Sequence, residues 1–212
     1  DGQATYFREM LRQVMNARPP KRRNFYTEWD YEQAVKEYEN NPIYGWCHKN
    51  TKADGTPYNI YKDGLKIYTT INSTMQQYAE EAMLKQLRTV IQPKMDAQYR
   101  STKVLFQNTS AEEREKIVRQ AMRYSDRYRA LKEEGRSEAE IDRIFRTPCP
   151  TRVFTYRGER DTILSPRDSI LHHKRIMRAG FVAIEPQTGR VKAYVGGPNF
   201  RYFKYDMAKQ GK

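Results

Sequence analysis

The stretch Phe181-Val-Ala-Ile-Glu-Pro-Gln-Thr-Gly-Arg-Val-Lys-Ala-Tyr-Val195 decides the fold of the C-terminal part of this chain. Two short runs with alternating side chains, 181–185 and 190–195, flank Pro186-Gln-Thr-Gly189. Proline presets a negative φ and glycine supplies a positive φ, which together favour a tight turn. The stretch therefore predicts a β-hairpin.

The same residues resemble the segment that opens the transpeptidase domain of class A penicillin-binding proteins. There, a hairpin with an acid-Pro-x-Thr-Gly turn ends in Val-Gly-Gly, as Glu185–Gly189 and Val195–Gly197 do here. In that family Gln-Gly-Lys, matched by 210–212, leads almost at once to a Ser-x-x-Lys nucleophile motif. This sequence contains no Ser-x-x-Lys, Ser-x-Asn or Lys-Ser/Thr-Gly. The resemblance implies a fragment that precedes the catalytic serine and cannot acylate.

Two further blocks carry the resemblance. Asp63-Gly-Leu-Lys-Ile-Tyr-Thr-Thr-Ile-Asn72 and the following 73–87 are similar to the stretch between the family's glycosyltransferase and transpeptidase domains. Residues 153–170 resemble what precedes the hairpin in long members from Gram-negative bacteria. From the residues alone, the alternation over 65–71 predicts a strand. The next segment is predicted to be a helix with one apolar face, made of Met75, Tyr78, Ala79, Ala82 and Met83.

The N-terminal third predicts two amphipathic helices and an irregular, aromatic-rich stretch. Residues 1–17 form the first helix and end before Pro19-Pro20, and residues 26–39 form the second and end at Asn40-Asn41-Pro42. The apolar face expected on the first helix consists of Phe7, Met10, Leu11 and Val14. In the irregular stretch, a short strand is predicted over residues 58–61.

The middle of the chain predicts a helical hairpin. Two capping boxes, Ser110 with Glu113 and Ser137 with Glu140, mark helix starts. The first helix is expected to run to Gly135, with an apolar stripe at helical spacing, and the second to be shorter. After it, 152–156 and 162–164 predict paired strands, and Ser165-Pro166 begins a further helix.

These elements predict an α+β fold, with a small antiparallel sheet packed with helices and a projecting helical insertion. We expect residues 1–63 to be an interdomain linker, 64–90 and 151–212 the N-terminal part of a transpeptidase domain, and 91–150 the insertion. Hairpin residues are expected to pack on the helices near Ser73 and Ser165, leaving the 111–146 hairpin as a separate lobe. Those hairpin residues are Phe181, Val182, Ile184 and Val191. An open sheet edge would favour self-association.

Composition restricts the function classes. The 212 residues carry a net charge of +13 and are 38% hydrophobic, which favours an open architecture over one large core. Nucleic acid is not expected as a partner, because no helix-turn-helix, zinc or ribonucleoprotein pattern accompanies the charge. The charges mostly alternate with acids, so a solvated surface is the simpler interpretation. A basic face beside an anionic leaflet is a third interpretation.

The sequence predicts no catalytic, cofactor-binding or metal-binding residues, and no cofactor. Glu80, Glu81 and Asp161 are acids without an arguable catalytic partner. His172 and His173 point about 100° apart on a helix, which is poor geometry for a shared metal. The pairing of Cys47 and Cys149 stays open at this stage.

The resemblance implies a non-catalytic linker or scaffold of a bifunctional peptidoglycan synthase, whose parent enzyme carries glycosyltransferase and penicillin-sensitive transpeptidase activities in cell-wall biosynthesis. It also implies the periplasmic side of the inner membrane, an anchor outside this sequence, and the remaining parent domains as partners. Peptidoglycan or a regulatory protein are further candidates. The alternative is a free-standing basic module that binds an anionic polymer. A reading frame that continues into Gly-Ser-x-x-Lys would decide against that alternative.

Overall fold

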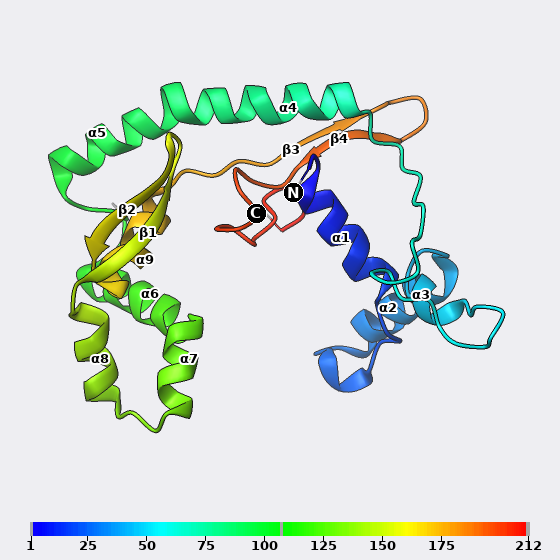
Figure 1. Cartoon of the computed structure of the whole chain (residues 1–212), viewed down its shortest axis with the longest axis horizontal. Coiled ribbons are helices and arrows are strands. Elements are labelled where there is room, and N and C mark those ends of the chain that lie inside the picture. The colour runs from blue at the N-terminus through cyan, green and yellow to red at the C-terminus, as the bar shows by residue number, and fades with distance from the viewer. Residues whose placement is uncertain (1, 107, 211–212) are drawn as a thin grey trace. The chain divides into compact units, whose positions relative to one another are not determined.

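The computed structural model describes residues 2–106 and 108–210 and combines helices with antiparallel strands (Figure 1). The expected α+β class is confirmed, and the strands form two separate two-stranded sheets. Two compact units divide the chain: unit 1 comprises 1–80 and 180–212, and unit 2 comprises 81–179. Gly211 and Lys212, which end the Gln-Gly-Lys run, lie outside the described residues.

Unit 1 begins with short helices that are connected by irregular segments. They are α1 (Thr5–Met15), η1 (Arg22–Asn24), α2 (Glu28–Asn40), α3 (Trp46–Lys49) and the first part of α4 (Ser73–Gln86). The Thr27 side chain caps α2 by accepting a hydrogen bond from the Asp30 N–H at 3.1 Å. In α1 the expected apolar face is only partly buried, and Tyr6 and Met15 are the buried residues.

The predicted hairpin is present as β3 (Phe181–Ile184) and β4 (Val191–Val195). The strands are antiparallel, with Phe181 opposite Val195 and a bulge between Ala183 and Ile184. In the turn, the Gly189 N–H donates to the Glu185 carbonyl at 2.8 Å while Gly189 holds a φ of 70°. Glycine tolerates this left-handed backbone without a steric cost, as the sequence predicted.

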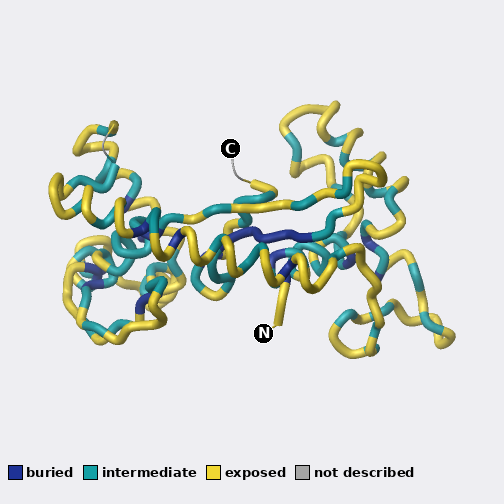
Figure 2. Tube along the Cα trace, turned by 90° about the horizontal axis from the view of Figure 1, so that it is seen from above, coloured by how far each residue is buried: buried dark blue, intermediate teal, exposed yellow. Residues whose placement is uncertain are grey.

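The packing predicted for the hairpin is wrong. Phe181, Val182 and Ile184 are exposed by 47%, 36% and 56%. The buried residues are instead the continuous run 193–197 at the end of β4, drawn in dark blue in Figure 2, where β4 packs against α1. Alternation identified a strand correctly, but it could not tell which side of a two-stranded ribbon the rest of the unit covers.

The two strands expected between 58 and 71 are absent. Residues 58 and 59 have no regular structure, 60–62 form a turn, and 65–71 form no regular structure. The second segment nevertheless lies beside β4, because the Thr70 hydroxyl donates to the Val191 carbonyl at 2.7 Å and the Asn72 N–H donates to the Lys192 carbonyl at 2.9 Å. The segment therefore contacts β4 through two hydrogen bonds without forming a ladder with it.

In unit 2, one helical run passes from α4 through a π-helical segment, η2 (Leu87–Ile91), into α5 (Gln92–Thr102). Pro93 explains the irregularity. A proline has no N–H to donate and its ring collides with the carbonyl four residues earlier, here Thr89. Widening the turn before Pro93 to the π form relieves this collision and lets the helix continue.

The predicted helical hairpin contains three helices, α6 (Ala111–Arg123), α7 (Asp126–Glu133) and α8 (Glu138–Arg146). Both capping boxes are present. The prediction of one helix up to Gly135 is wrong, since Ser125 accepts a hydrogen bond from the Tyr128 N–H and starts a new helix. Serine competes with the helical backbone in this way wherever its neighbours permit.

The remaining elements of unit 2 are the hairpin β1 (Cys149–Thr155) and β2 (Gly158–Leu164), followed by α9 (Pro166–Arg175). The core is formed by buried residues of α6 and α8, against which Ile170 and Leu171 of α9 pack. Those core residues are Val118, Met122, Ile141 and Phe145. We expected a lobe separate from the helix after Ser165, but the two share one core.

Candidate functional site

Gln76 is the centre of a polar junction in unit 1. Its side chain is fully buried and pairs with the backbone of Tyr194 in β4. The Tyr194 N–H donates to Gln76 Oε1 at 2.7 Å, and Gln76 Nε2 donates to the Tyr194 carbonyl at 3.0 Å. One amide side chain thus takes the place of a neighbouring strand. Glu80 accepts from Gln76 Nε2 at 2.7 Å and from the Ala4 N–H at 2.9 Å, which ties α1 to α4.

The same junction holds the segment after β4. The Tyr194 hydroxyl donates to Asp206 Oδ2 at 2.7 Å, and burial followed by this carboxylate raises the pKa of Tyr194. Asp206 Oδ1 accepts from the Ala208 N–H at 2.9 Å. The Tyr6 hydroxyl donates to the Phe203 carbonyl at 2.6 Å. These bonds fix the course of the chain just before the Gln-Gly-Lys run.

Val-Gly-Gly has a steric explanation at this junction. A Cβ at Gly196 would lie 2.7 Å from Tyr6 Cδ1, and one at Gly197 would lie 2.8 Å from Tyr6 Cζ. Cβ atoms are not found this close to other heavy atoms, so only glycine lets the chain leave the end of β4 beside the Tyr6 ring. The motif thus keeps space for a buried aromatic residue from α1.

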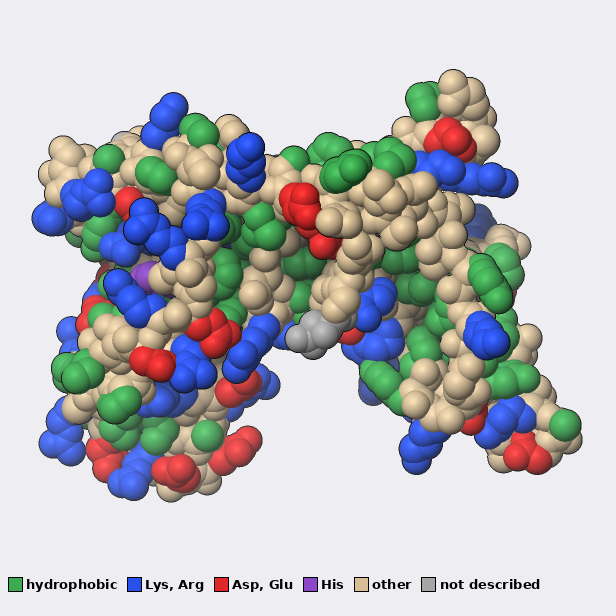
Figure 3. Space-filling model, turned by 45° about the horizontal axis from the view of Figure 1, so that its top comes forward, with side chains coloured by type: hydrophobic (Ala, Val, Ile, Leu, Met, Phe, Trp, Pro, Cys, Tyr) green, Lys and Arg blue, Asp and Glu red, His purple; other side chains and the backbone are tan. Residues whose placement is uncertain are grey.

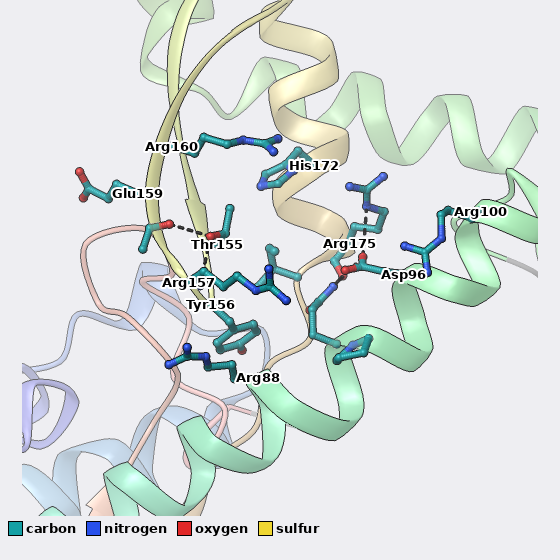
Figure 4. A pocket seen from close by; sticks show the side chains of 14 residues that line it. Arg88, Asp96, Arg100, Thr155, Tyr156, Arg157, Glu159, Arg160, His172 and Arg175 are labelled. Carbon is teal, nitrogen blue, oxygen red and sulfur yellow. Dashed lines mark hydrogen bonds and ion pairs between the residues drawn. The ribbon is translucent and has the colours of Figure 1, made fainter.

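Unit 2 contains a cleft of about 640 Å³, lined by residues of η2, α5, the β1–β2 turn and α9 (Figure 4). Its lining is dominated by arginines: Arg88, Arg100, Arg157, Arg160 and Arg175. Two carboxylates, Asp96 and Glu159, also line it. We call this feature the arginine cleft.

His172 and His173 lock α9 to β1. The Nε2–H of His172 donates to the Phe154 carbonyl at 2.7 Å, while His173 Nε2 accepts from the Phe154 N–H at 3.3 Å. Burial lowers the pKa of both imidazoles, and the nearby cations Arg175 and Arg160 lower that of His172 further. Both histidines are half-buried, and His172 forms part of the cleft wall.

Arg175 lies in the cleft beside an aromatic ring and a carboxylate. Its guanidinium lies 4.5 Å from the centre of the Tyr99 ring, and its Nε lies 4.0 Å from Asp96 Oδ1. That Nε is buried and has no hydrogen-bond partner among the described residues. Asp96 also accepts from Gln92 Nε2 at 3.1 Å. A buried donor without a partner is uncommon in folded proteins, so this Nε is a candidate contact for a ligand in the cleft.

The other residues considered from sequence have structural environments. Asp161 forms a bidentate pair with Arg152 on the opposite strand, at 2.7 and 2.9 Å, which lowers the pKa of Asp161. Glu81 is exposed. Cys47 is a buried free cysteine of unit 1, and Cys149 is a half-buried free cysteine of unit 2. Within 2–106 and 108–210, no group of metal-ligating side chains is found, and no helix is long and apolar enough to cross a membrane.

Sequence reasoning missed Gln76 and the arginine cleft. Gln76 lies on a helix whose apolar residues seemed to define the buried face, yet Met75 and Tyr78 are exposed by 44% and 65%. A polar side chain inside an otherwise amphipathic helix was the available signal. The cleft arginines come from distant positions and give no local motif.

In a comparison with known families, residues 101–177 match the model described as the penicillin-binding protein middle domain. The matched segment includes α6 to α9 and the β1–β2 hairpin, so these elements are similar to that middle domain. The resemblance drawn from the flanking motifs is confirmed at this level, and such a domain is part of a larger parent protein. No curated protein and no solved structure matches the chain.

Proposed function

We propose that this chain is the non-catalytic linker and scaffold region of a bifunctional, class A penicillin-binding protein. It would lie between the glycosyltransferase domain and the catalytic serine of the transpeptidase domain. The observation that carries the proposal is a middle-domain match over 101–177 followed directly by a hairpin with the Glu-Pro-x-Thr-Gly turn and Val-Gly-Gly end. The first feature points to the family and the second to this position within it.

In this proposal 1–63 is the linker, 64–90 and 151–212 start the transpeptidase domain, and 91–150 is the insertion. The exposure of Phe181, Val182 and Ile184 supports the second assignment, because apolar residues of a strand are normally covered. β3 and β4 form a two-stranded sheet, and such a ribbon is marginal by itself. Further strands and helices of the parent transpeptidase domain would cover this face.

The proposed task is to hold the residues before the nucleophile in place. Gln76, Tyr194 and Asp206 fix β4 and the segment that follows it, and in the resembling family the catalytic serine comes shortly after that segment. The protein would act on the periplasmic side of the membrane, where peptidoglycan is assembled. Its basic surface, on which Lys and Arg are scattered among acids (Figure 3), would stay solvated beside anionic lipid headgroups.

Penicillin labelling tests the proposal. The 212-residue chain should form no covalent adduct with a fluorescent penicillin, because it contains no Ser-x-x-Lys. The full reading frame should continue into that motif and yield a labelled protein whose band disappears with competing ampicillin. A labelled 212-residue chain, or a frame that ends near Lys212, would overturn the proposal.

The scaffold role has its own readout in the full-length protein. Replacing Gln76 by Leu should slow penicillin acylation although the serine is untouched, whereas Gln86→Leu on the exposed side of α4 should leave the acylation rate within about twofold. Equal acylation rates for both variants would show that the junction does not position the catalytic segment.

A further inference from the structure

The arginine cleft has more positive than negative charge. Five arginines and two carboxylates line it, which leaves an excess of three positive charges. Arg88, Arg100, Arg157 and Arg160 are exposed, and none of their side chains forms a hydrogen bond or ion pair within the described residues. Like charges gathered in one concave site raise the local potential and attract anions.

The two carboxylates do not neutralise these four arginines. Asp96 is engaged by Gln92 and by Arg175. Glu159 lies 3.8 Å from Arg152 on the neighbouring strand. In addition, the Arg175 Nε is a buried donor without a hydrogen-bond partner among the described residues. The cleft therefore presents both uncompensated charge and an unused donor.

The donor geometry selects the type of anion. In Figure 4 the arginines approach the cleft from several elements: Arg88 and Arg100 from the long helical run, Arg157 and Arg160 from the β-hairpin, and Arg175 from α9. Guanidinium groups are planar and bind phosphate oxygens in pairs, which a lysine ammonium does not do. A phosphate monoester carries about −1.5 to −2 charges at neutral pH, so two phosphates match the excess of three.

We propose that the arginine cleft binds a small polyanion bearing two phosphate groups. Its volume of about 640 Å³ lies within the range of small-molecule sites. The Tyr156 hydroxyl donates to the Met177 carbonyl at 2.5 Å, so this tyrosine offers a ring rather than a donor. With Pro93 and Ile176, that ring provides an apolar wall for whatever carries the phosphates. The ligand is either free in solution or the headgroup of a phospholipid.

Calorimetry with inorganic pyrophosphate tests the site on the 212-residue chain. The double variant Arg157→Gln/Arg160→Gln should weaken pyrophosphate binding at least tenfold. Arg119→Gln/Arg143→Gln is the matched control, because it removes the same charge from exposed positions of α6 and α8 outside the cleft. It should change the affinity less than twofold. Equal losses in both variants, or no pyrophosphate binding by the wild-type chain, would overturn the proposal.

Two further arms identify the ligand class and its source. Citrate, a carboxylate polyanion, should bind at least tenfold more weakly than pyrophosphate, and tighter citrate binding would overturn the phosphate assignment. Sedimentation with vesicles that contain diacylglycerol pyrophosphate, a lipid whose headgroup carries two phosphates, then separates the sources. Co-sedimentation that the cleft variant loses and the control keeps supports a lipid headgroup, whereas pyrophosphate binding without co-sedimentation supports a soluble ligand. Pyrophosphate should also shift the NMR signals of His172, and unchanged signals would place the binding elsewhere.

Discussion

The helical part of unit 2 and the hairpin of unit 1 are stabilised in different ways. The helices α6 and α8 bury Val118, Met122, Ile141 and Phe145 in one apolar cluster. The hairpin instead depends on polar bonds between residues far apart in sequence, such as Gln76 with Tyr194. An apolar cluster tolerates small shifts because the hydrophobic effect has no direction, whereas a buried amide must match both of its partners. The hairpin is therefore expected to be the more easily disturbed by polar substitutions.

Phe145→Ala should have the largest effect. The side chain is 1% exposed within the core of unit 2, so its loss leaves a cavity and should lower the free energy of unfolding by about 3–5 kcal/mol. Urea denaturation followed by circular dichroism measures this change. Tyr124 is 75% exposed in the same unit, so Tyr124→Ala should change the free energy of unfolding by no more than about 0.5 kcal/mol. Similar losses for both would contradict the assigned core.

Gln76→Leu tests the polar junction. The change leaves the buried N–H and carbonyl of Tyr194 without their partner. The free energy of unfolding should fall by about 1–3 kcal/mol for each group. Hydrogen exchange should accelerate at the Tyr194 amide and stay unchanged in 111–146. Gln86→Leu, at an exposed position of α4, is the control. Unchanged protection of Tyr194 would mean that this amide has another stabilising partner.

Gly197→Ala tests the explanation of Val-Gly-Gly. The new methyl group would lie 2.8 Å from Tyr6 Cζ and should destabilise the protein by about 1–3 kcal/mol. In a Tyr6→Leu background the cost of Gly197→Ala should fall to within about 0.5 kcal/mol, because the ring is gone. A double-mutant cycle of unfolding free energies measures this coupling. Additive effects would show that Gly197 is needed for another reason.

The smallest expected effect is the loss of stability at low pH that comes from the two capping-box glutamates. Hydrogen bonds from the Ser110 and Ser137 N–H groups lower the pKa values of Glu113 and Glu140. Because these folded-state pKa values lie below the usual one, the stabilisation is present above the unfolded pKa and is lost as pH falls through the folded pKa. Glu113→Gln/Glu140→Gln keeps the acceptors but does not titrate. Its melting temperature should fall less on acidification than that of wild type, and parallel curves would contradict this.

The sequence predicted the local structure of unit 2 better than its packing. Ser110 and Ser137 marked true helix starts, because a cap is a contact between residues three apart. Ser125 was missed as a third cap, since a continuous apolar stripe from α6 into α7 favoured one helix. The helical spacing of His172 and His173 indicated only that they point in different directions, because their partner Phe154 lies on a strand that only the fold brings near.

By itself, the sequence determined the β3–β4 hairpin, its turn, the two capping boxes and the resemblance to penicillin-binding proteins. All of these depend on residues close together in the chain or on motifs of fixed spacing. The tertiary structure decided which face of the hairpin is buried, why Gly196 and Gly197 are required, and that Gln76 replaces a strand partner. It also brought together five arginines from separate elements to line the arginine cleft. These outcomes depend on contacts between residues distant along the chain, and local propensity and period contain no information about such contacts.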